Sequence, residues 1–381
     1  MTPADRDVVD LLAGLVAVDS VNPSLVDGGA GEREIAAHVA RWAARAGLRA
    51  EVVEATPGRP SVIVRTPHHG DGPTLLLCGH LDTVGVGGMH DPWTPRIDGD
   101  RLYGRGAYDM KGGLAAALVA AREASGAGIG GAVVVAAVAD EEHASIGVQE
   151  VLRSVRADAA VVTEPTELAV ATAHKGFVWT EITVTGRAAH GSRPHLGVDA
   201  ILKAGPVLVG LDALDRALSD RTHPLLGSGN LHGSLISGGL EESTIPDRCT
   251  VVVERRTLPG ETVADVERDI GDLLARCRAA DPGLTVRSRT LLVREPFETA
   301  RTEPIVRAVA RAVGETLGRA AEIGGVSYWA DAAFISAAGI PTVLFGPDGD
   351  GAHAQVEWVS LPGTLACARA LTRAAVGFCG R

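Results

Sequence analysis

Hydrophobic residues recur along the chain in patterns that predict its helices and strands. Residues 4–18 and 32–46 carry apolar side chains at helical spacing, and each run is long enough for a helix. Two short runs rich in β-branched residues follow, at 51–54 and 61–65, where we expect strands. The next run, Thr74–Cys78, is apolar on both faces, which is typical of a strand buried inside an α/β sheet.

Strand and helix patterns then alternate. We expect a helix from Asp109 to about Ala124, a strand at Ala132–Val138, a helix near Gly147–Arg153 and a strand at Ala159–Val162. Each parallel connection between strands needs a crossover element, so this alternation favours an α/β fold with a mostly parallel sheet and helices on both faces.

The pattern changes near Phe177. The elements expected from there are a strand at 178–185, a helix at 198–217, strands at 231–236 and 249–255, a helix at 263–279 and a strand at 284–291. This order, βαββαβ, is the order of the ferredoxin-like split unit, which forms a complete small domain.

The first pattern returns in the last part of the chain. We expect helices at 303–317 and 361–376, the apolar run 330–338 and a strand at 340–345. The sequence therefore predicts one α/β domain formed by residues 1–176 and 293–381. Residues 177–292 would be inserted into it as a second domain.

The composition narrows the class of protein. Of 381 residues, 46% are hydrophobic and 22% are charged, which is typical of a soluble globular chain. The net charge of -11 argues against nucleic acid and against an anionic membrane surface as partners. It is compatible with a protein that carries extra carboxylates to hold cations.

The sequence also suggests a compartment. The apolar run Leu11–Val18 is flanked by aspartates rather than by a basic region, so we interpret it as an amphipathic helix and not as a signal peptide. No apolar run approaches the roughly 20 residues that a membrane span needs. The five scattered cysteines suggest no disulfide framework, and a reducing cytoplasm is the simplest location.

Candidate chemistry lies where the predicted strands end. His80, Glu141, Glu142 and Glu164 each follow or end a buried strand. In open α/β sheets, ligands bind outside the carboxyl ends of the strands. His353 follows the last predicted strand through a Gly-rich loop. These positions favour a common site.

The Gly-rich stretch Gly104–Gly113 contains Asp109, on which we centre the site. Glycines before a helix often cradle phosphate, but neither the Gly-Lys-Ser/Thr sequence nor the strand–GxGxxG–helix order is present. A second alternative is that Asp109 only caps its helix.

Two divalent cations would resolve the charge problem that such a site creates. If His80, Asp109, Glu142, Glu164 and His353 meet, three buried carboxylates repel one another. Imidazole and carboxylate are ordinary zinc ligands, and a carboxylate shared by two metals about 3.5–4 Å apart is the usual two-metal arrangement. We therefore expect Asp109 to bridge two ions, with zinc first and cobalt or manganese as alternatives.

Two neighbours of these ligands have candidate roles. Asp82 lies two residues from His80, so both point the same way in an extended segment, and Asp82 can orient the imidazole. Glu141 precedes Glu142, so one can bind a metal while the other faces the attacking water. A glutamate beside metal-activated water is a good general base.

Seven motifs, in order and over nearly the whole chain, resemble one enzyme family. They are Gly79–Thr83, Gly104–Gly113, Asp140–Glu142, Thr163–Pro165, Arg187–Ser192, Arg255–Glu261 and Gly339–Pro347. The sequence is similar to the co-catalytic dizinc amidohydrolases and metallopeptidases, the family of acetylornithine deacetylase, succinyl-diaminopimelate desuccinylase, aminoacylase and bacterial glutamate carboxypeptidase. The resemblance implies a zinc-peptidase-like catalytic domain with an inserted lid and dimerisation domain.

The resemblance also implies a ligand set. His80, Asp109 and Glu164 are similar to the ligands of one zinc ion. Asp109, Glu142 and His353 are similar to those of the other. In the family, the peptide bond after the bridging aspartate is cis.

Four further residues receive roles from the resemblance. Glu141 is similar to the family's general base, and Asp82 to the partner of the histidine at 80. His190 resembles the lid histidine that reaches the other subunit's active site and steadies the oxyanion, which implies a homodimer formed through residues 177–292. Arg256 resembles the arginine that binds a substrate carboxylate. The alternatives are a surface histidine at 190 and, at 256, an arginine paired with an acidic neighbour.

These observations predict an enzyme that cleaves the amide bond of small N-acyl amino acids through a metal-bridging water, as acetylornithine deacetylase does. A carboxypeptidase, a dipeptidase or a succinyl-diaminopimelate desuccinylase-like enzyme could use the same site. A third alternative is an inactive binding protein of this fold, but Glu141 and all the expected ligands are present. Ser243 and Val356 depart from the family pattern and leave the side-chain specificity open.

Overall fold

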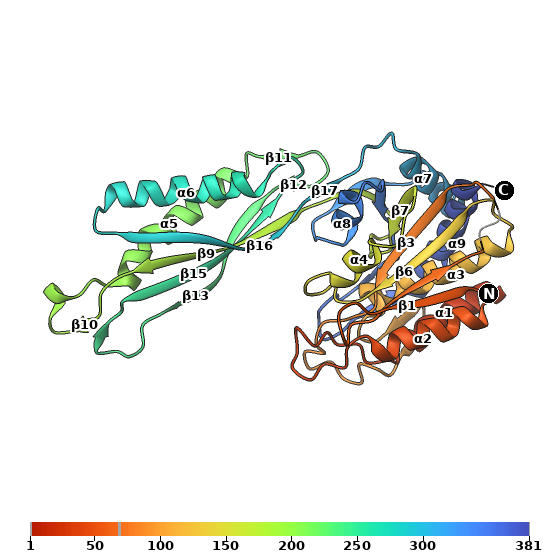
Figure 1. The fold of residues 1–381 in the computed structure, drawn as a ribbon, viewed down its shortest axis with the longest axis horizontal. Coiled ribbons are helices and arrows are strands. Elements are labelled where there is room, and N and C mark those ends of the chain that lie inside the picture. The colour runs from red at the N-terminus through yellow and green to blue at the C-terminus, as the bar shows by residue number, and fades with distance from the viewer. Residues whose placement is uncertain (1, 68–69, 381) are drawn as a thin grey trace. The chain divides into compact units, whose positions relative to one another are not determined.

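Two units make up the structure, a computed structural model that describes residues 2–67 and 70–380 (Figure 1). The first unit contains Met1–Thr172, Thr299–Gly324 and Ala330–Arg381, and the second contains Ala173–Glu298 and Gly325–Trp329. The first unit is thus assembled from both ends of the chain. Among the described residues, no helix has the length and apolar character that crossing a membrane requires.

The first unit is built on a sheet that is parallel at its centre. Its strands lie in the order β1 (Arg49–Val53), β2 (Ser61–Arg65), β6 (Ala132–Val138), β3 (Thr74–His80), β7 (Ala159–Val162), β19 (Thr342–Leu344) and β8 (Val170–His174). The four strands from β6 to β19 run parallel, whereas β1, β2 and β8 are antiparallel to their neighbours. The expected α/β fold is confirmed.

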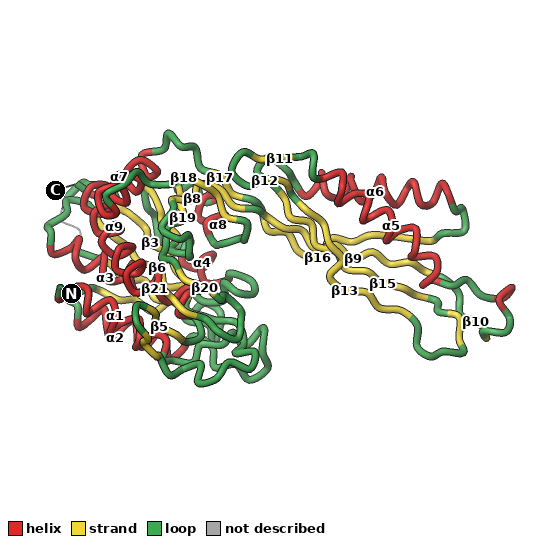
Figure 2. Tube along the Cα trace, turned by 180° about the vertical axis from the view of Figure 1, so that it is seen from behind, coloured by secondary structure: helices red, strands yellow, loops and turns green. Residues whose placement is uncertain are grey.

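Helices cover both faces of this sheet (Figures 1 and 2). One face packs against α1 (Pro3–Val16), α2 (Arg33–Arg45), α3 (Gly112–Gly126), α7 (Pro304–Leu317) and α9 (Leu361–Cys379). The other face carries α4 (Ile146–Val151) and α8 (Ala332–Ala337). All seven residues of β6 are buried, because apolar side chains of this strand face a helical layer on each side.

The Gly-rich stretch differs from our expectation that Asp109 opens a helix. Asp109 lies in a π-helical turn, η1 (Ala107–Lys111), and its φ of -114° and ψ of 95° are not helical. The loop before it needs glycine, because Gly104 and Gly106 have φ values of 151° and 78°. The peptide bond between Asp109 and Met110 is cis, as the resemblance implies. The regular helix α3 begins only after this turn.

A small antiparallel sheet brings the two ends of the first unit together. Its strands lie in the order β20 (Gly349–Asp350), β21 (Trp358–Ser360), β5 (Arg101–Tyr103) and β4 (Arg96–Asp98). The pairing of β21 with β5 places the loop that carries His353 beside the loop that leads to Asp109. The sequence did not predict this sheet, because strands of two or three residues have no recognisable period.

The second unit has the expected βαββαβ order. Its elements are β9 (Gly176–Thr185), α5 (Ala200–Leu218), β13 (Asn230–Gly238), β15 (Arg248–Thr257), α6 (Val263–Ala280) and β16 (Thr285–Arg294). The strands form an antiparallel sheet in the order β13-β15-β9-β16, and α5 and α6 pack on one face of it.

Four pairings of short strands complete the description. The second unit adds β10 (Ala189–His190) with β14 (Thr244–Ile245), and β11 (Thr222–His223) with β12 (Gly227–Ser228). Finally, β17 (Phe297–Glu298) pairs with Ala173 and His174 at the end of β8, and β18 (Ile323–Val326) also pairs with β8.

Candidate metal centre

Three neighbouring parallel strands deliver acidic and imidazole side chains to one edge of the sheet. His80 is the last residue of β3, Glu141 and Glu142 follow β6, and Glu164 follows β7. Since β6, β3 and β7 are adjacent and parallel, their carboxyl ends meet at this edge. The site lies where ligands of open α/β sheets bind.

The two carboxylate oxygens of Asp109 face two different histidines. Asp109 Oδ1 lies 3.1 Å from His80 Nε2, which is also 3.7 Å from Glu164 Oε1. Asp109 Oδ2 lies 3.3 Å from His353 Nε2, which is also 3.2 Å from Glu142 Oε2. The structure therefore divides five residues into two groups of three that share Asp109, one at each of its oxygens.

These separations fit metal coordination. Two ligand atoms each about 2.0–2.1 Å from one tetrahedral ion are roughly 3.3 Å apart. Among the described residues, potential ligand atoms of His80, Asp109 and Glu142 lie within 4.8 Å of one another, and so do those of His80, Glu141 and Glu164. These two clusters share His80, whereas the two groups given by the distances above share Asp109; the donor types of both suit divalent cations.

Hydrogen bonds between Asp109 and the two histidines favour a charged carboxylate and charged imidazole rings. Burial opposes ionisation of Asp109, but hydrogen bonds to His353 and His80 lower its pKa below the usual range. Hydrogen bonds to Asp109 and Glu142 raise the pKa of His353 to about 10. Burial disfavours charged His80, yet its bond to Asp109 and the charge of Glu164 raise its pKa well above its usual value. The site thus attracts positive charge.

The pKa values of the other carboxyl groups show that nearby positive charge would stabilise their ionised forms. Burial raises the pKa of Glu141 and of Glu164 well above the usual range, and the negative charges of neighbouring carboxylates add to the effect. The pKa of Glu142 is raised for the same reasons. Carboxyl groups with raised pKa values hold protons until a cation replaces them.

Asp82 contacts His80 mainly through its main chain. His80 Nδ1 donates to the main-chain oxygen of Asp82 at 2.9 Å, whereas the nearer carboxylate oxygen is 3.8 Å away. This bond leaves Nε2 facing Asp109 and Glu164. The carboxylate of Asp82 instead accepts a hydrogen bond from the main-chain nitrogen of Glu141.

One buried residue near the site received no role in the sequence analysis. Glu357 Oε2 accepts hydrogen bonds from Arg105 Nη1 at 2.7 Å and from the main-chain nitrogen of Gly106 at 2.9 Å. Arg105 also donates to the main-chain oxygen of Ala354 at 2.8 Å. The only local signal was the short distance of Glu357 along the chain from His353.

The remaining two predicted residues belong to the second unit. His190 is exposed on β10, and its Nδ1 lies 2.8 Å from Ser192 Oγ. Arg256 on β15 donates through Nε to Glu254 Oε1 at 2.6 Å and lies over the ring of Phe177, 5.0 Å from its centroid. Pairing with an acidic neighbour, the alternative considered for Arg256, is present. The groups described above belong to the first unit.

Comparison with known proteins gives consistent matches. A family model described as Peptidase family M20/M25/M40 matches residues 76–376. The acetylornithine deacetylase of Vibrio atlanticus is 29% identical over 92% of this chain and 93% of that protein. The acetylornithine deacetylase of Myxococcus xanthus is 32% identical over 80% of each.

Solved structures share the fold. A tripeptidase from Staphylococcus aureus has a TM-score of 0.81 at 18% identity, with 98% of each chain covered. A dinuclear metal binding peptidase of the M20 family from Bacillus subtilis has a TM-score of 0.76 at 15% identity, again with 98% of each chain covered. At such identities the likeness is one of fold.

Proposed function

The chain belongs to peptidase family M20/M25/M40 and is a hydrolase, and we propose that it cleaves the amide bond of small N-acyl amino acids with two bound divalent cations. The observation that carries the proposal is Asp109, whose two oxygens face His80 and His353 separately at 3.1 and 3.3 Å. The acetylornithine deacetylases that match nearly the whole chain support the deacylase reaction over other hydrolyses.

The two groups that share Asp109 would hold the proposed cations. One group adds His80 and Glu164, and the other adds Glu142 and His353. When bound, the ions would polarise the substrate carbonyl and make a water molecule acidic enough to be deprotonated near neutral pH. Imidazole with carboxylate suits zinc first, and cobalt and manganese are the alternatives.

Glu141 is the proposed general base. Its carboxylate lies in the same cluster as His80 and Glu164, and burial raises its pKa. It would take a proton from the attacking water while the new C–O bond forms. It would then give that proton to the amine nitrogen as the C–N bond breaks. Proton transfer by a placed side chain typically contributes 10²–10⁴-fold to rate.

Two residues of the second unit are proposed to bind the substrate. Arg256 would pair with a free carboxylate, which accounts for a preference for N-acyl amino acids over neutral amides. Its bond to Glu254 and its position over Phe177 limit its rotamers before substrate arrives. His190 of the partner subunit would donate a hydrogen bond to the oxyanion.

A homodimer follows from that role of His190, and exposed apolar side chains support it. Leu202 and Val209 on α5 are 75% and 68% exposed, and Leu235 and Ile236 on the edge strand β13 are 68% and 59% exposed. Apolar surface of this kind marks interaction sites. We place the enzyme in the cytoplasm, where its five free cysteines would stay reduced.

A substrate panel tests the proposal. N-acetyl, N-succinyl and N-formyl amino acids and dipeptides would be assayed with added zinc and with a chelator. We expect chelator-sensitive release of the amino acid from an N-acyl substrate, and loss of at least about 100-fold in kcat for Glu141→Gln with both ions retained. Cleavage of dipeptides alone would show a dipeptidase, and full turnover by the Gln variant would contradict the assignment of the base.

A further inference from the structure

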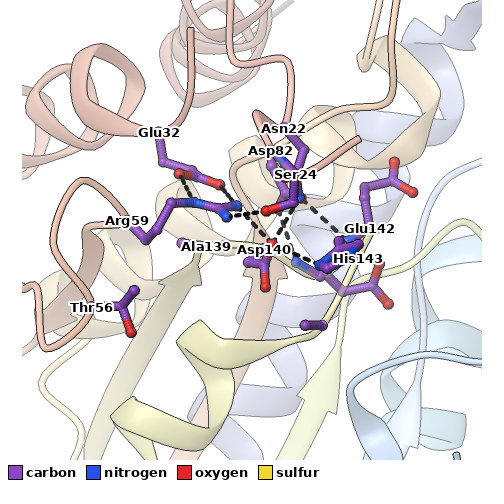
Figure 3. A network of polar contacts seen from close by, with 12 residues as sticks. Asn22, Ser24, Glu32, Thr56, Arg59, Asp82, Ala139, Asp140, Glu142 and His143 are labelled. Carbon is purple, nitrogen blue, oxygen red and sulfur yellow. Dashed lines mark hydrogen bonds and ion pairs between the residues drawn. The ribbon is translucent and has the colours of Figure 1, made fainter. Parts of the chain in front are cut away.

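A buried network of polar side chains, shown in Figure 3, contacts the turn that carries Glu141 and Glu142. It joins four segments of the first unit that are far apart in the chain. Its members are Asn22, Glu32, Arg59, Asp82 and Asp140, none more than 7% exposed. Neither the family resemblance nor the strand-end rule pointed to Asn22, Glu32 or Arg59.

Asn22 is the centre of this network. Its side-chain nitrogen donates to Asp82 Oδ2 at 2.8 Å and to Asp140 Oδ1 at 3.0 Å, so it uses both of its N–H groups on two carboxylates. Its side-chain oxygen accepts from the main-chain nitrogen of Ser24 at 2.9 Å. Its main chain is tied as well, because its nitrogen donates to the oxygen of Thr83 at 2.9 Å.

Arg59 supplies the positive charge. Its Nε and Nη2 form a two-point pair with the carboxylate of Glu32, and Nη2 also lies 2.8 Å from Asp140 Oδ1. Its Nη1 donates to Ser24 Oγ at 3.0 Å. A planar guanidinium held in this way has its remaining donor directions fixed. Asp140 therefore receives donors from both Arg59 and Asn22 on one oxygen.

The network ends on the main chain of the two glutamates. Asp82 Oδ1 accepts from the nitrogen of Glu141 at 3.1 Å, and Asp82 Oδ2 accepts from the nitrogen of Glu142 at 3.2 Å. Asp140, just before them, has a φ of 66°, in the left-handed region. Such a conformation costs a non-glycine residue about 1–3 kcal/mol and persists only where its surroundings impose it. The contacts to Asp82 and Asp140 impose it here.

We propose that Asn22 and Arg59 are positioning residues of the reaction: they hold Asp82 and Asp140 so that Glu141 and Glu142 project correctly from the turn. The inference rests on the proposed function, since it takes Glu141 as the general base and Glu142 as a metal ligand. Neither Asn22 nor Arg59 belongs to the two groups that share Asp109. Each acts through a carboxylate that binds the main chain of the turn.

The chemistry of the network makes Asn22 hard to replace. An alanine at this position would leave two buried carboxylates facing each other without a donor between them. An aspartate would add a third negative charge and remove both donors, so Asn22→Asp should have the larger effect. Arg59→Lys keeps the charge but loses the planar fork that pairs with Glu32. Its zinc affinity and kcat should therefore lie between those of wild type and Arg59→Met.

The test measures cation binding separately from turnover. Affinities for zinc would be obtained by competition with a chelating dye for wild type, Asn22→Ala, Asn22→Asp, Arg59→Lys and Arg59→Met. Changes to residues that orient metal ligands typically cost 10–100-fold in affinity or activity. We expect a loss of that size for Asn22→Ala, a larger one for Asn22→Asp, and a fall in kcat with KM within about twofold.

Asn230→Ala is the matched control, because Asn230 is exposed at the start of β13. It should leave affinity and kcat unchanged. If folded Asn22→Ala and Arg59→Lys kept wild-type zinc affinity and kcat, the positioning role would be wrong. If an Asn22 variant did not fold, Arg59→Lys would decide. Wild type that binds zinc but cleaves no N-acyl amino acid would contradict the proposed substrate, while the affinity comparison would still decide the network.

Discussion

Glu357 Oε1 accepts a hydrogen bond of 3.1 Å from the main-chain nitrogen of Asp109, a residue 248 positions earlier in the chain. The same oxygen accepts from the nitrogen of Tyr108 at 2.9 Å. One buried carboxylate therefore holds the turn that presents Asp109, and Glu357 lies four residues after His353. Glu357 thus links the loop that carries His353 to the main chain of Asp109.

Replacing Glu357 should loosen both loops. Glu357→Ala would leave Arg105, which is 1% exposed, without its carboxylate partner. Breaking a buried pair by removing one side typically costs 3–5 kcal/mol. We expect a loss of about that size in the free energy of unfolding, measured with urea, together with weaker zinc binding in the protein that remains folded.

Glu34→Ala provides the comparison, because Glu34 is an exposed glutamate in the first turn of α2. Exposed positions of this kind usually change stability by less than about 0.5 kcal/mol. Equal stability of the two variants would show that Glu357 is not needed to hold the turn.

Without cations, the metal centre should stabilise the folded protein less as the pH rises. Burial raises the pKa of Glu141 and Glu164 well above the value of 4.5, and hydrogen bonds to Asp109 and Glu142 raise that of His353 to about 10. In stripped folded protein these groups thus hold more protons than in the unfolded chain, the two carboxyls above about pH 4.5 and His353 from about pH 6.5 to about pH 10. Their contribution to the free energy of unfolding therefore falls as the pH rises.

Melting temperatures of stripped and zinc-loaded protein at pH 5, 7 and 9 would check this prediction. Cations displace the same protons, so the difference in melting temperature between loaded and stripped protein should widen with pH. Glu164→Gln removes one titrating carboxyl and should flatten the slope of the stripped protein. A difference that stayed constant or narrowed would contradict the assignment of these groups.

Charge on the exposed face of α5 should prevent dimerisation. Leu202 and Val209 are seven residues apart, two helical turns, and therefore lie on the same face. We expect Leu202→Glu with Val209→Glu to convert a dimer to a monomer in sedimentation experiments. Turnover should then fall while zinc content stays the same. Val52→Glu, which is 53% exposed on β1, is the control, and an active monomeric wild type would exclude the role assigned to His190.

Local patterns predicted the buried strands best. The expected bounds Ser61–Arg65, Ala132–Val138 and Ala159–Val162 match β2, β6 and β7, because a strand covered on both faces is apolar at every position whatever its partners. The turn around Asp109 was predicted as a helix, since Ala-rich sequence favours helix. Its conformation depends on contacts to Glu357, which a local pattern does not contain.

For the site, the sequence predicted the candidate ligands but not the residues that hold them in place. Residue type and position at strand ends identified candidates such as His80 and Glu164. The residues that hold them in place have no such signature. Glu32 precedes α2 and resembles an ordinary acidic helix start, while Asn22 and Arg59 lie in loops. Their chemistry arises only when the fold places them around Asp82.

The last prediction concerns the close contact between α3 and the end of β7. A Cβ at Gly113 would lie 1.8 Å from the main-chain oxygen of Thr163, the residue before Glu164. Gly113→Ala should therefore displace Glu164 from Asp109, with a loss of at least about 1–3 kcal/mol and weaker zinc binding. Gly126, at the other end of α3, has nothing within 4 Å of such a Cβ. Gly126→Ala should instead gain about 0.5–1 kcal/mol. Since both changes add one methyl group to the same helix, equal effects on zinc affinity would show that this contact does not position Glu164.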